Sequence, residues 1–307
     1  MHNGRVLITG GVGFIGTHLC RALVAQGKQV LCLDIRKPEK RNKVEGVHYI
    51  QGDIRSEEAQ DMVARYQADT VFHLAAHIDN LASMEDPLMD ASHNISGTLN
   101  ILQGVRRAGR GKVIFASSCA VYGNQEQFPT HESAELQLGS PYGLSKRTAE
   151  QYLDLYYKHF GVPYIALRKA NVYGPGQDTS RESGVITVFT SRLLAGQPVA
   201  IYSDGESTRD YMHIDDTVDA YLRASESDFV GVLNIGTGVQ VSTKQVFHLV
   251  KNVIGVDIQE EYREDVKDAV RFSGIDARKA GEVLGWKPRV VFEDGVEKTV
   301  EWYRGNI

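Results

Sequence analysis

Short apolar runs alternate with amphipathic segments through the first half of the chain. The apolar runs are rich in valine, leucine and isoleucine and predict β-strands. They are RVLIT (5–9), QVLCLD (29–34), VHYIQGD (47–53), TVFHLA (70–75), KVIFASS (112–118) and PYIALR (163–168). The segments between them repeat apolar residues at helical spacing, at 14–27, 59–66, 90–109 and about 140–160. This alternation predicts an α/β fold with a doubly wound parallel sheet of the Rossmann type.

The pattern changes from residue 171 onward, where strands are fewer and loops longer. Short strands are expected at VAIY (199–202), VLNIG (232–236) and IQEEY (258–262), and helices at 215–227, 243–254, 276–284 and 295–304. We therefore expect a Rossmann domain at 1–170 and a smaller C-terminal α/β lobe at 171–307, with some segments interleaving. Ligands of open α/β sheets bind at the carboxyl ends of the strands.

A glycine-rich turn, TGGVGFIG, follows the first strand and opens a helix. Gly10, Gly13 and Gly16 let backbone N–H groups and the helix N-terminus approach a pyrophosphate. Asp34 ends the second strand, 18 residues after Gly16, where a carboxylate can accept both ribose hydroxyls and repel a 2′-phosphate. The pattern predicts a dinucleotide site that favours NAD. Arg36 lies just beyond the acid and leaves NADP open as an alternative.

The stretch SPYGLSK places a phenol and an ammonium group four residues apart on a predicted helix. Ser140 can cap this helix and Pro141 suits its first turn, so that Tyr142 and Lys146 project from one face. A cation held about 5 Å from a phenol lowers its pKa. The pair is therefore a candidate for proton transfer near neutral pH, and the alternative is a surface pair on an amphipathic helix.

Composition and charge narrow the classes of function. The net charge of −5 gives no general attraction for nucleic acid. No apolar run is long enough to span a membrane, and the three cysteines match no disulfide or zinc framework, so we expect a cytoplasmic protein. His73 and His77 have a spacing that could bind zinc on a helix, but they fall at a strand end, and no metal is predicted. Cys119 has no base placed for it and is expected to be a buried small residue rather than a nucleophile.

Several blocks together resemble the extended short-chain dehydrogenase/reductase family, in particular its sugar-nucleotide epimerase/dehydratase branch. They cover nearly the whole chain in the order found in that family. The blocks are TGGVGFIG, GDI at 52–54, HLAAH at 73–77, SSCAVYG at 117–123, YGLSK at 142–146, RKANVYGPG at 168–176 and DGESTRDYMHIDD at 204–216. The family binds NAD and acts on nucleotide sugars, so the resemblance implies both for this chain.

The resemblance also implies roles for single residues. Tyr142 would transfer the proton, Lys146 would bind the nicotinamide ribose, and Ser118 would hydrogen-bond the reacting sugar oxygen. The implied cofactor-binding residues are Gly10, Gly13, Phe14, Ile15, Gly16, Asp34, Ile35, Asp53, Ile54, Leu74, Ala75, Ala76, Asn94, Tyr142, Lys146 and Ala170. The implied substrate-binding residues are Ser83, Ser118, Tyr142, Asn171, Val185, Tyr202, Arg209, Arg271 and Ser273.

Two positions before Tyr122 distinguish the reactions of this branch. Dehydratases and decarboxylases usually carry a carboxylate two residues before that tyrosine, and dehydratases often carry a second acid directly before the first, whereas this chain has Ala120 and Cys119 at these positions. The chain is thus similar to UDP-glucose 4-epimerases, which oxidise C4 and return the same hydride to the opposite face. The alternatives are a UDP-uronate 4-epimerase, with Arg181 as a candidate for the carboxylate, another NDP-sugar epimerase or reductase, and a catalytically idle NAD-binding regulator.

Two further expectations rest on the resemblance alone. Ser273 stands three residues before Asp276, where a bulky aromatic residue in relatives blocks an N-acetyl group, so UDP-GlcNAc and UDP-GalNAc are expected to be accepted. Relatives also form homodimers through two long helices, here about 88–108 and 142–160, which would make a four-helix interface.

Overall fold

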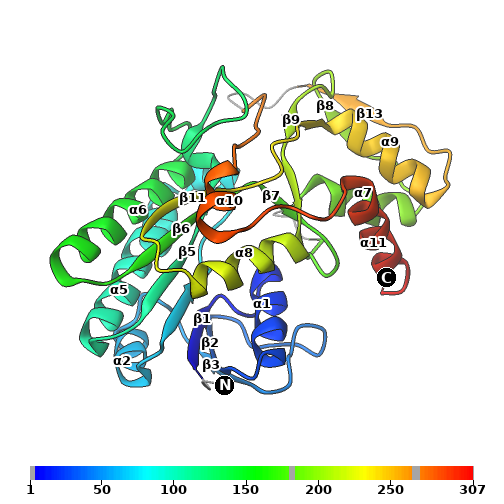
Figure 1. The fold of residues 1–307 in the computed structure, drawn as a ribbon. Helices are drawn as coiled ribbons and strands as arrows, with labels where there is room; N and C mark the ends of the chain where they lie inside the picture. Colours follow the sequence, from blue (N-terminus) through cyan, green and yellow to red (C-terminus); the bar gives the residue numbers. More distant parts are fainter. Residues whose placement is uncertain (1–3, 180–183, 265–269, 307) are drawn as a thin grey trace. The chain divides into compact units, whose positions relative to one another are not determined.

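The computed structural model describes residues 4–179, 184–264 and 270–306. Its central feature is a seven-stranded sheet in the order β11-β6-β5-β4-β1-β2-β3 (Figure 1). The strands are β1 (Arg5–Thr9), β2 (Gln29–Asp34), β3 (Val47–Gln51), β4 (Thr70–His73), β5 (Lys112–Ser118), β6 (Tyr164–Lys169) and β11 (Gly231–Ile235). β1 pairs in parallel with both β2 and β4, so the strand order reverses beside β1. The predicted doubly wound sheet is confirmed, and ligands of such sheets bind at this reversal.

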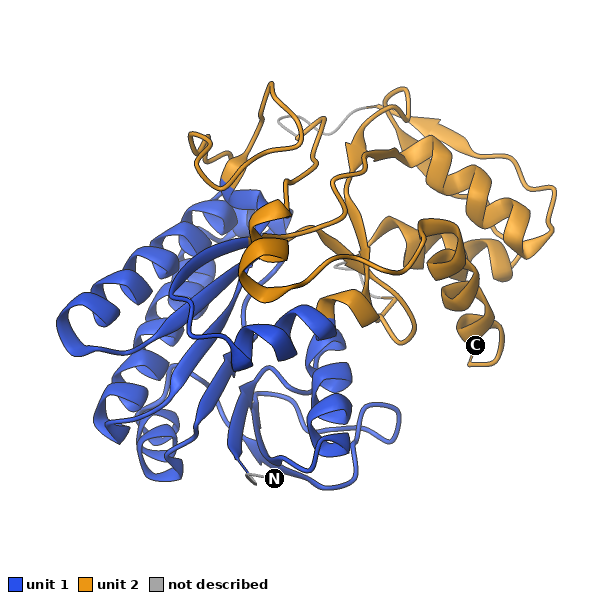
Figure 2. Ribbon diagram, in the orientation of Figure 1, with its two compact units in different colours: residues 1–121, 140–168, 218–233 blue, residues 122–139, 169–217, 234–307 orange. Residues whose placement is uncertain are grey.

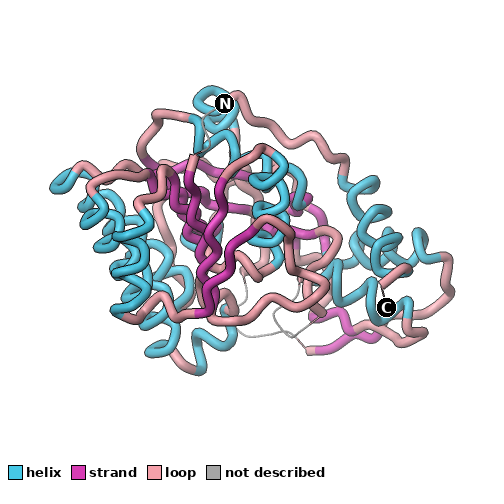
Figure 3. The backbone as a smooth tube through the Cα atoms, turned by 90° about the horizontal axis from the view of Figure 1, so that it is seen from below, coloured by secondary structure: helices cyan, strands magenta, loops and turns pink. Residues whose placement is uncertain are grey.

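Helices cover both faces of this sheet (Figures 1 and 3). On one face lie α2 (Glu57–Tyr66), α5 (Gly97–Ala108) and α6 (Pro141–Phe160). Their apolar stripes pack with the strands into one buried cluster, which includes Leu7, Val63, Ile101 and Leu153. On the other face lie α1 (Phe14–Ala25) and much of α8 (Ile214–Glu226), where the ring of Tyr221 meets Phe72 edge to face.

The predicted helix at 90–109 is divided in the structure. It begins earlier, as α4 (Pro87–Ala91), continues through a π-helical turn at Ser92–Ser96, and ends as α5. The side chain of Asp86 caps α4 by accepting a hydrogen bond from Met89 N at 2.9 Å. A short helix that the sequence pattern did not reveal, α3 (Asn80–Glu85), precedes it and is capped by Asp79. Single π-turns inside helices occur often at functional sites.

The chain forms two compact units (Figure 2). Unit 1 is made of residues 1–121, 140–168 and 218–233, and unit 2 of residues 122–139, 169–217 and 234–307. The run VLNIG, expected among the strands of the smaller lobe, instead forms β11 at the edge of the main sheet. A short apolar run fits either sheet, and only the fold of the chain selects the partner strand.

In its described residues, unit 2 contains short strand pairs, four whole helices and the start of α8. β7 (Asn171–Tyr173) pairs with β10 (Tyr211–His213), β9 (Thr208–Arg209) with β12 (Val241–Ser242), and β8 (Ala200–Tyr202) with β13 (Glu261–Arg263). The helices are α7 (Val185–Leu194), α9 (Thr243–Ile254), α10 (Arg278–Leu284) and α11 (Phe292–Arg304). The bounds of α9 agree with the prediction, because Ser242 and Gln245 form a capping box and Gly255 ends the helix in a left-handed conformation.

Candidate active site

The glycine-rich turn leaves no room for side chains at two positions. Gly10 has φ +73°, and a Cβ atom there would lie 2.7 Å from Ala75 N. A Cβ atom on Gly16 would collide with the carbonyl oxygen of Gly10 and lie 2.6 Å from Gly11 Cα. The turn therefore packs closely against the segment that follows β4 and the start of α1, and Gly10 and Gly13 remain partly exposed. This cradle fits a dinucleotide pyrophosphate.

The acidic residue at the end of β2 is buried and holds the same turn. Asp34 Oδ2 accepts a hydrogen bond from Val12 N, and its Oδ1 accepts one from Arg36 N, both at 2.9 Å. The Arg36 guanidinium is well exposed, with its Nε 3.9 Å from Asp34 Oδ1. In the next loop, Arg55 pairs with Asp53 and holds the pKa of that carboxyl below its usual range. Both predicted acids thus lie at the carboxyl ends of neighbouring strands, as a nucleoside site requires.

The end of β4 is fixed by threonine and histidine side chains. Ala75 N donates to Thr9 Oγ1 at 3.2 Å, and His73 places its ring nitrogens 2.7 Å from Thr9 Oγ1 and 3.0 Å from Thr98 Oγ1. Burial lowers the pKa of His73 to about 3, so this histidine is neutral. Both its nitrogens are engaged with hydroxyl groups, which argues against the zinc alternative.

Asn94 lies in the π-helical turn and is almost fully buried. Its Oδ1 accepts from His77 N at 2.9 Å, and its Nδ2 donates to His77 O, Asp90 Oδ1 and Ser145 Oγ. The predicted cofactor residue therefore ties the loop after β4 to α6 with its own side chain.

Tyr142 lies in the first turn of α6 and is buried. Ser140 caps the helix by accepting from Gly143 N at 3.1 Å, as the sequence predicts. The Ser83 hydroxyl accepts from Tyr142 N at 3.2 Å and donates to Asn80 O at 2.7 Å. Ser83, expected to bind substrate, thus holds the backbone of Tyr142. The Ser118 side chain hydrogen-bonds the Tyr142 phenol.

The expected lowering of the Tyr142 pKa is wrong for this structure. Burial raises the pKa of the phenol, and the hydrogen bond from Ser118 only opposes that rise. Lys146 is buried too, and its Nζ lies 5.8 Å from the centre of the Tyr142 ring. The ammonium group donates to Ala116 O at 3.0 Å and lies over the Phe115 ring. Desolvation of the phenol therefore outweighs the lysine charge.

The sequence did not reveal a buried ion cluster on α6, the helix that carries Tyr142 and Lys146. Glu150 accepts from Ser117 Oγ at 2.6 Å and from two nitrogens of Arg168 at 2.9 and 2.7 Å. It joins α6 to β5 and β6 one turn beyond Lys146. The sequence shows only that Glu150 falls on the apolar face of the predicted helix. Spacing alone does not distinguish such an acid from one exposed to solvent.

Unit 2 brings together several of the predicted substrate residues. Asn171 N donates to Asp210 O at 2.9 Å, and Thr208 N donates to Arg271 O at 2.9 Å. Arg209 Nη1 donates to Thr208 O at 2.7 Å and lies 3.4 Å from Arg271 O. The Arg271 guanidinium, half exposed, is paired with Asp204 at 2.7 Å. Two arginines from distant segments therefore lie on adjoining backbone, with the Arg271 guanidinium engaged by Asp204.

The structure gives the positions of four other predicted residues. Ser273 lies two residues beyond Arg271 and is partly buried, Tyr202 is half exposed on β8, and Val185 opens α7 against the unit 2 core. Ala170, predicted to bind cofactor, belongs to unit 2 and donates its amide to Ile235 O at 2.9 Å. Arg181, the candidate for a uronate carboxylate, lies outside the described residues.

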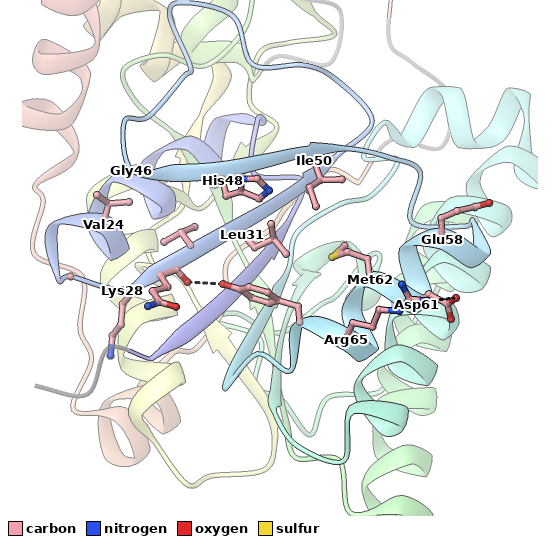
Figure 4. Close-up of a pocket in the computed structure, with 14 residues that line it drawn as sticks. Val24, Lys28, Leu31, Gly46, His48, Ile50, Glu58, Asp61, Met62 and Arg65 are labelled. Carbon is pink, nitrogen blue, oxygen red and sulfur yellow. Dashed lines mark hydrogen bonds and ion pairs between the residues drawn. The ribbon is translucent and has the colours of Figure 1, made fainter.

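Unit 1 also contains a groove of about 1010 Å³ (Figure 4). It is lined by Leu31, Ile50 and Met62, with Lys28 and Arg65 among its charged residues. Figure 4 shows Leu31 on β2, Ile50 on β3, and Met62 and Arg65 on α2, with Lys28 just before β2. Tyr66 Oη donates to Gln29 O at 3.0 Å. None of the predicted catalytic, cofactor or substrate residues lines it, so we do not assign the active site there.

Unit 1 thus carries a glycine turn that fits a dinucleotide, an acid at the end of β2 and a Ser–Tyr–Lys group on a Rossmann sheet, and this combination is typical of a dinucleotide-dependent oxidoreductase-type enzyme. The model of the NAD dependent epimerase/dehydratase family matches residues 6–236, and the chain belongs to this family. The resemblance noted in the sequence is confirmed.

Similar proteins extend this assignment over the full chain. A UDP-glucose 4-epimerase of Mycolicibacterium smegmatis is 36% identical, and the match covers 98% of each chain. A UDP-glucose 4-epimerase of Thermotoga maritima, solved with UDP-glucose, has a TM-score of 0.96 and 39% identity and covers 98% of this chain and 99% of its own. The Thermus thermophilus UDP-glucose 4-epimerase, solved with NAD, has a TM-score of 0.93 and 34% identity and covers 99% of this chain and 100% of its own. No helix in the described part of this chain is long and apolar enough to cross a membrane.

Proposed function

We propose that this protein is an NAD-dependent UDP-sugar 4-epimerase that interconverts UDP-glucose and UDP-galactose. The observation that carries the proposal is the buried Tyr142, bonded to Ser118, in the unit whose glycine turn fits a dinucleotide. Unit 1 would hold NAD, and unit 2 would hold the nucleotide sugar through Asn171, Arg209 and Arg271. The similar proteins from Mycolicibacterium smegmatis and Thermotoga maritima are UDP-glucose 4-epimerases, which supports the proposal. We place this protein in the cytoplasm.

In the proposed reaction, Tyr142, Ser118 and Lys146 each have a separate role. Bound NAD⁺ would supply the acceptor for the hydride of sugar C4 and would return that hydride to the opposite face, so that no net redox change would result. Tyr142 takes the proton of the 4-hydroxyl group as the C–H bond breaks and gives it back afterwards. Ser118 holds the sugar oxygen beside the phenol. The hydrogen bond from Lys146 Nζ to Ala116 O fixes the position of the ammonium group. Cys119 and Ala120 supply no acid for elimination of water.

The proposal predicts that the purified protein carries NAD and consumes none. A hydride that returns to its own substrate requires a retained cofactor. Denaturing the protein should release about one dinucleotide per chain, and UDP-galactose should be converted to UDP-glucose without added NAD⁺. Turnover that consumes free NAD⁺ mole for mole would instead indicate a dehydrogenase.

We further propose that Ser273 admits N-acetylated sugars. A serine leaves room for an acetamido group, whereas a tyrosine would overpack the site at a cost of about 1–3 kcal/mol. We expect the wild type to accept UDP-GalNAc alongside UDP-Gal, and Ser273→Tyr to lower kcat/KM for UDP-GalNAc selectively by roughly 5- to 150-fold. Ser273→Ala, which adds no bulk, is the control. Rejection of UDP-GalNAc by the wild type, or an unchanged ratio in Ser273→Tyr, excludes the role.

We also propose a homodimer formed through the helices of unit 1. Large apolar side chains are exposed along α3, α4 and α6, which contact one another. They are Leu81 (60% exposed), Met84 (58%), Leu88 (82%), Leu144 (51%) and Leu155 (45%). An apolar face of this kind is typical of a surface that a second chain covers.

Light scattering at micromolar concentration should give the mass of a dimer, and Leu88→Arg should shift it toward the monomer. Val239→Arg is the matched control, because Val239 is also well exposed but belongs to unit 2. A wild-type monomer would exclude the dimer, and a dimer that resists Leu88→Arg would exclude this face.

A further inference from the structure

Asp210, between β9 and β10, is hydrogen-bonded through both carboxylate oxygens and is only 1% exposed. Its Oδ1 accepts from Thr237 N at 2.9 Å and from Thr237 Oγ1 at 2.6 Å. Its Oδ2 accepts from Gly238 N at 2.9 Å and lies 3.4 Å from Ile275 N. These four donors fill the capacity of an ionised carboxylate.

The carboxylate occupies a space that the surrounding backbone closes. A Cβ atom on Gly236 would lie 2.7 Å from Asp210 Oδ2 and 2.6 Å from Ile275 Cγ1. The segments at 236–238 and 275 thus approach residue 210 closely. Burial raises the pKa of Asp210, and the bonds from Thr237, Gly238 and Ile275 oppose that rise.

The segments that Asp210 ties together carry the candidate sugar-nucleotide residues. Arg209 precedes it directly, and the segment that holds Arg271 and Ser273 ends at its bonded neighbour Ile275. Its own carbonyl oxygen accepts from Asn171 N at 2.9 Å. One buried residue therefore contacts or adjoins all three parts of the predicted unit 2 site.

We propose that Asp210 is a positioning residue whose carboxylate holds Arg209 and the 271–275 segment in register, so that the nucleotide diphosphate meets arginines already in place. The inference rests on the proposed function, since it takes a UDP-sugar as the ligand of these arginines. Asp210 touches neither substrate nor cofactor. It acts through the loops that it bonds, and its contribution should be to substrate binding rather than to proton transfer.

Asp210→Asn tests this role most directly, because the asparagine amide has the shape of the carboxylate but only one acceptor oxygen instead of two. Its NH₂ group must face either the Thr237 donors or the Gly238 and Ile275 amides, so one half of the network is lost. Calorimetry with UDP as the probe should show about 10- to 100-fold weaker binding. Retained NAD should be unchanged, and kcat at saturating UDP-galactose should stay within about twofold of the wild type.

Asp216→Asn is the matched control. Asp216 is another buried aspartate of unit 2, and its two oxygens accept from Arg289 N and Val290 N at 3.0 Å, away from the predicted site residues. It should lower thermal stability and leave UDP affinity as in the wild type.

Thr237→Val removes only one hydroxyl donor to Asp210. This variant should fold, and its UDP affinity should be a few-fold lower than that of the wild type.

The outcomes separate this inference from the proposed function. If the wild type binds neither UDP nor UDP-galactose, the proposed function fails. If the wild type binds UDP, but Asp210→Asn and Thr237→Val bind it equally well, the proposed function stands and the positioning role is excluded. Equal losses of affinity in Asp216→Asn would likewise exclude the role, since they would reflect general destabilisation of unit 2. If Asp210→Asn does not fold, Thr237→Val alone decides.

Discussion

Replacing Tyr142 with phenylalanine should lower kcat by about 10²- to 10⁴-fold, the usual contribution of a general acid–base group. The ring is kept and remains buried in α6, so the fold should stay intact and NAD should be retained. Because burial raises the pKa of this phenol, the phenolate fraction grows toward alkaline pH, and wild-type turnover should rise with pH. The phenylalanine variant should lack that rise. Steady-state turnover of UDP-galactose across pH, with circular dichroism and released NAD, measures all three.

Tyr156→Phe is the control for this substitution. Tyr156 lies on the same helix and is equally buried, but it belongs to the apolar cluster and to no predicted site. It should keep wild-type turnover and pH dependence. Turnover in Tyr142→Phe equal to that of Tyr156→Phe would rule out Tyr142 as the base.

Replacing Gly10 with alanine should have the second-largest effect, on cofactor retention. A left-handed φ costs an alanine about 1–2 kcal/mol, and the new methyl group would also lie 2.7 Å from Ala75 N and 2.9 Å from Ala75 Cα. These are backbone atoms at the end of a central strand and cannot rotate away. The turn must then shift from its place beside β4, at an overpacking cost of about 1–3 kcal/mol. Retained NAD should fall, with affinity lowered roughly 5- to 150-fold.

Gly27→Ala separates the strain of the backbone from the collision. Gly27 has φ +74°, almost the same as Gly10, but nothing lies within 4 Å of the Cβ position. This variant should lose a similar amount of stability and still release about one NAD per chain on denaturation. Full NAD content in Gly10→Ala would show that the turn tolerates the methyl group and does not form the cradle as described.

The sequence by itself determined the main features of unit 1. Alternation of short apolar runs and helical segments predicts a parallel sheet, because parallel strands are buried on both faces and therefore read as nearly continuous apolar runs. A glycine-rich turn between a strand and a helix predicts a dinucleotide site. Caps such as Ser140 and the Ser242–Gln245 box are local, which explains why α6 and α9 begin where the pattern predicts. The family also follows from the sequence, since its blocks are contiguous stretches in a set order.

Only the tertiary structure decided features that depend on residues far apart in the chain. β11 joins the main sheet beside β6, a pairing that no local pattern in VLNIG specifies. The pKa of Tyr142 rises because its surroundings exclude water, while spacing revealed only that a lysine lies four residues away. Ser83, Asn94 and Asp210 act through hydrogen bonds to distant backbone groups, so their roles depend on burial and direction. Sequence spacing predicts neither the burial of a side chain nor the direction of its hydrogen bonds, because both are set only when the strands and loops pack.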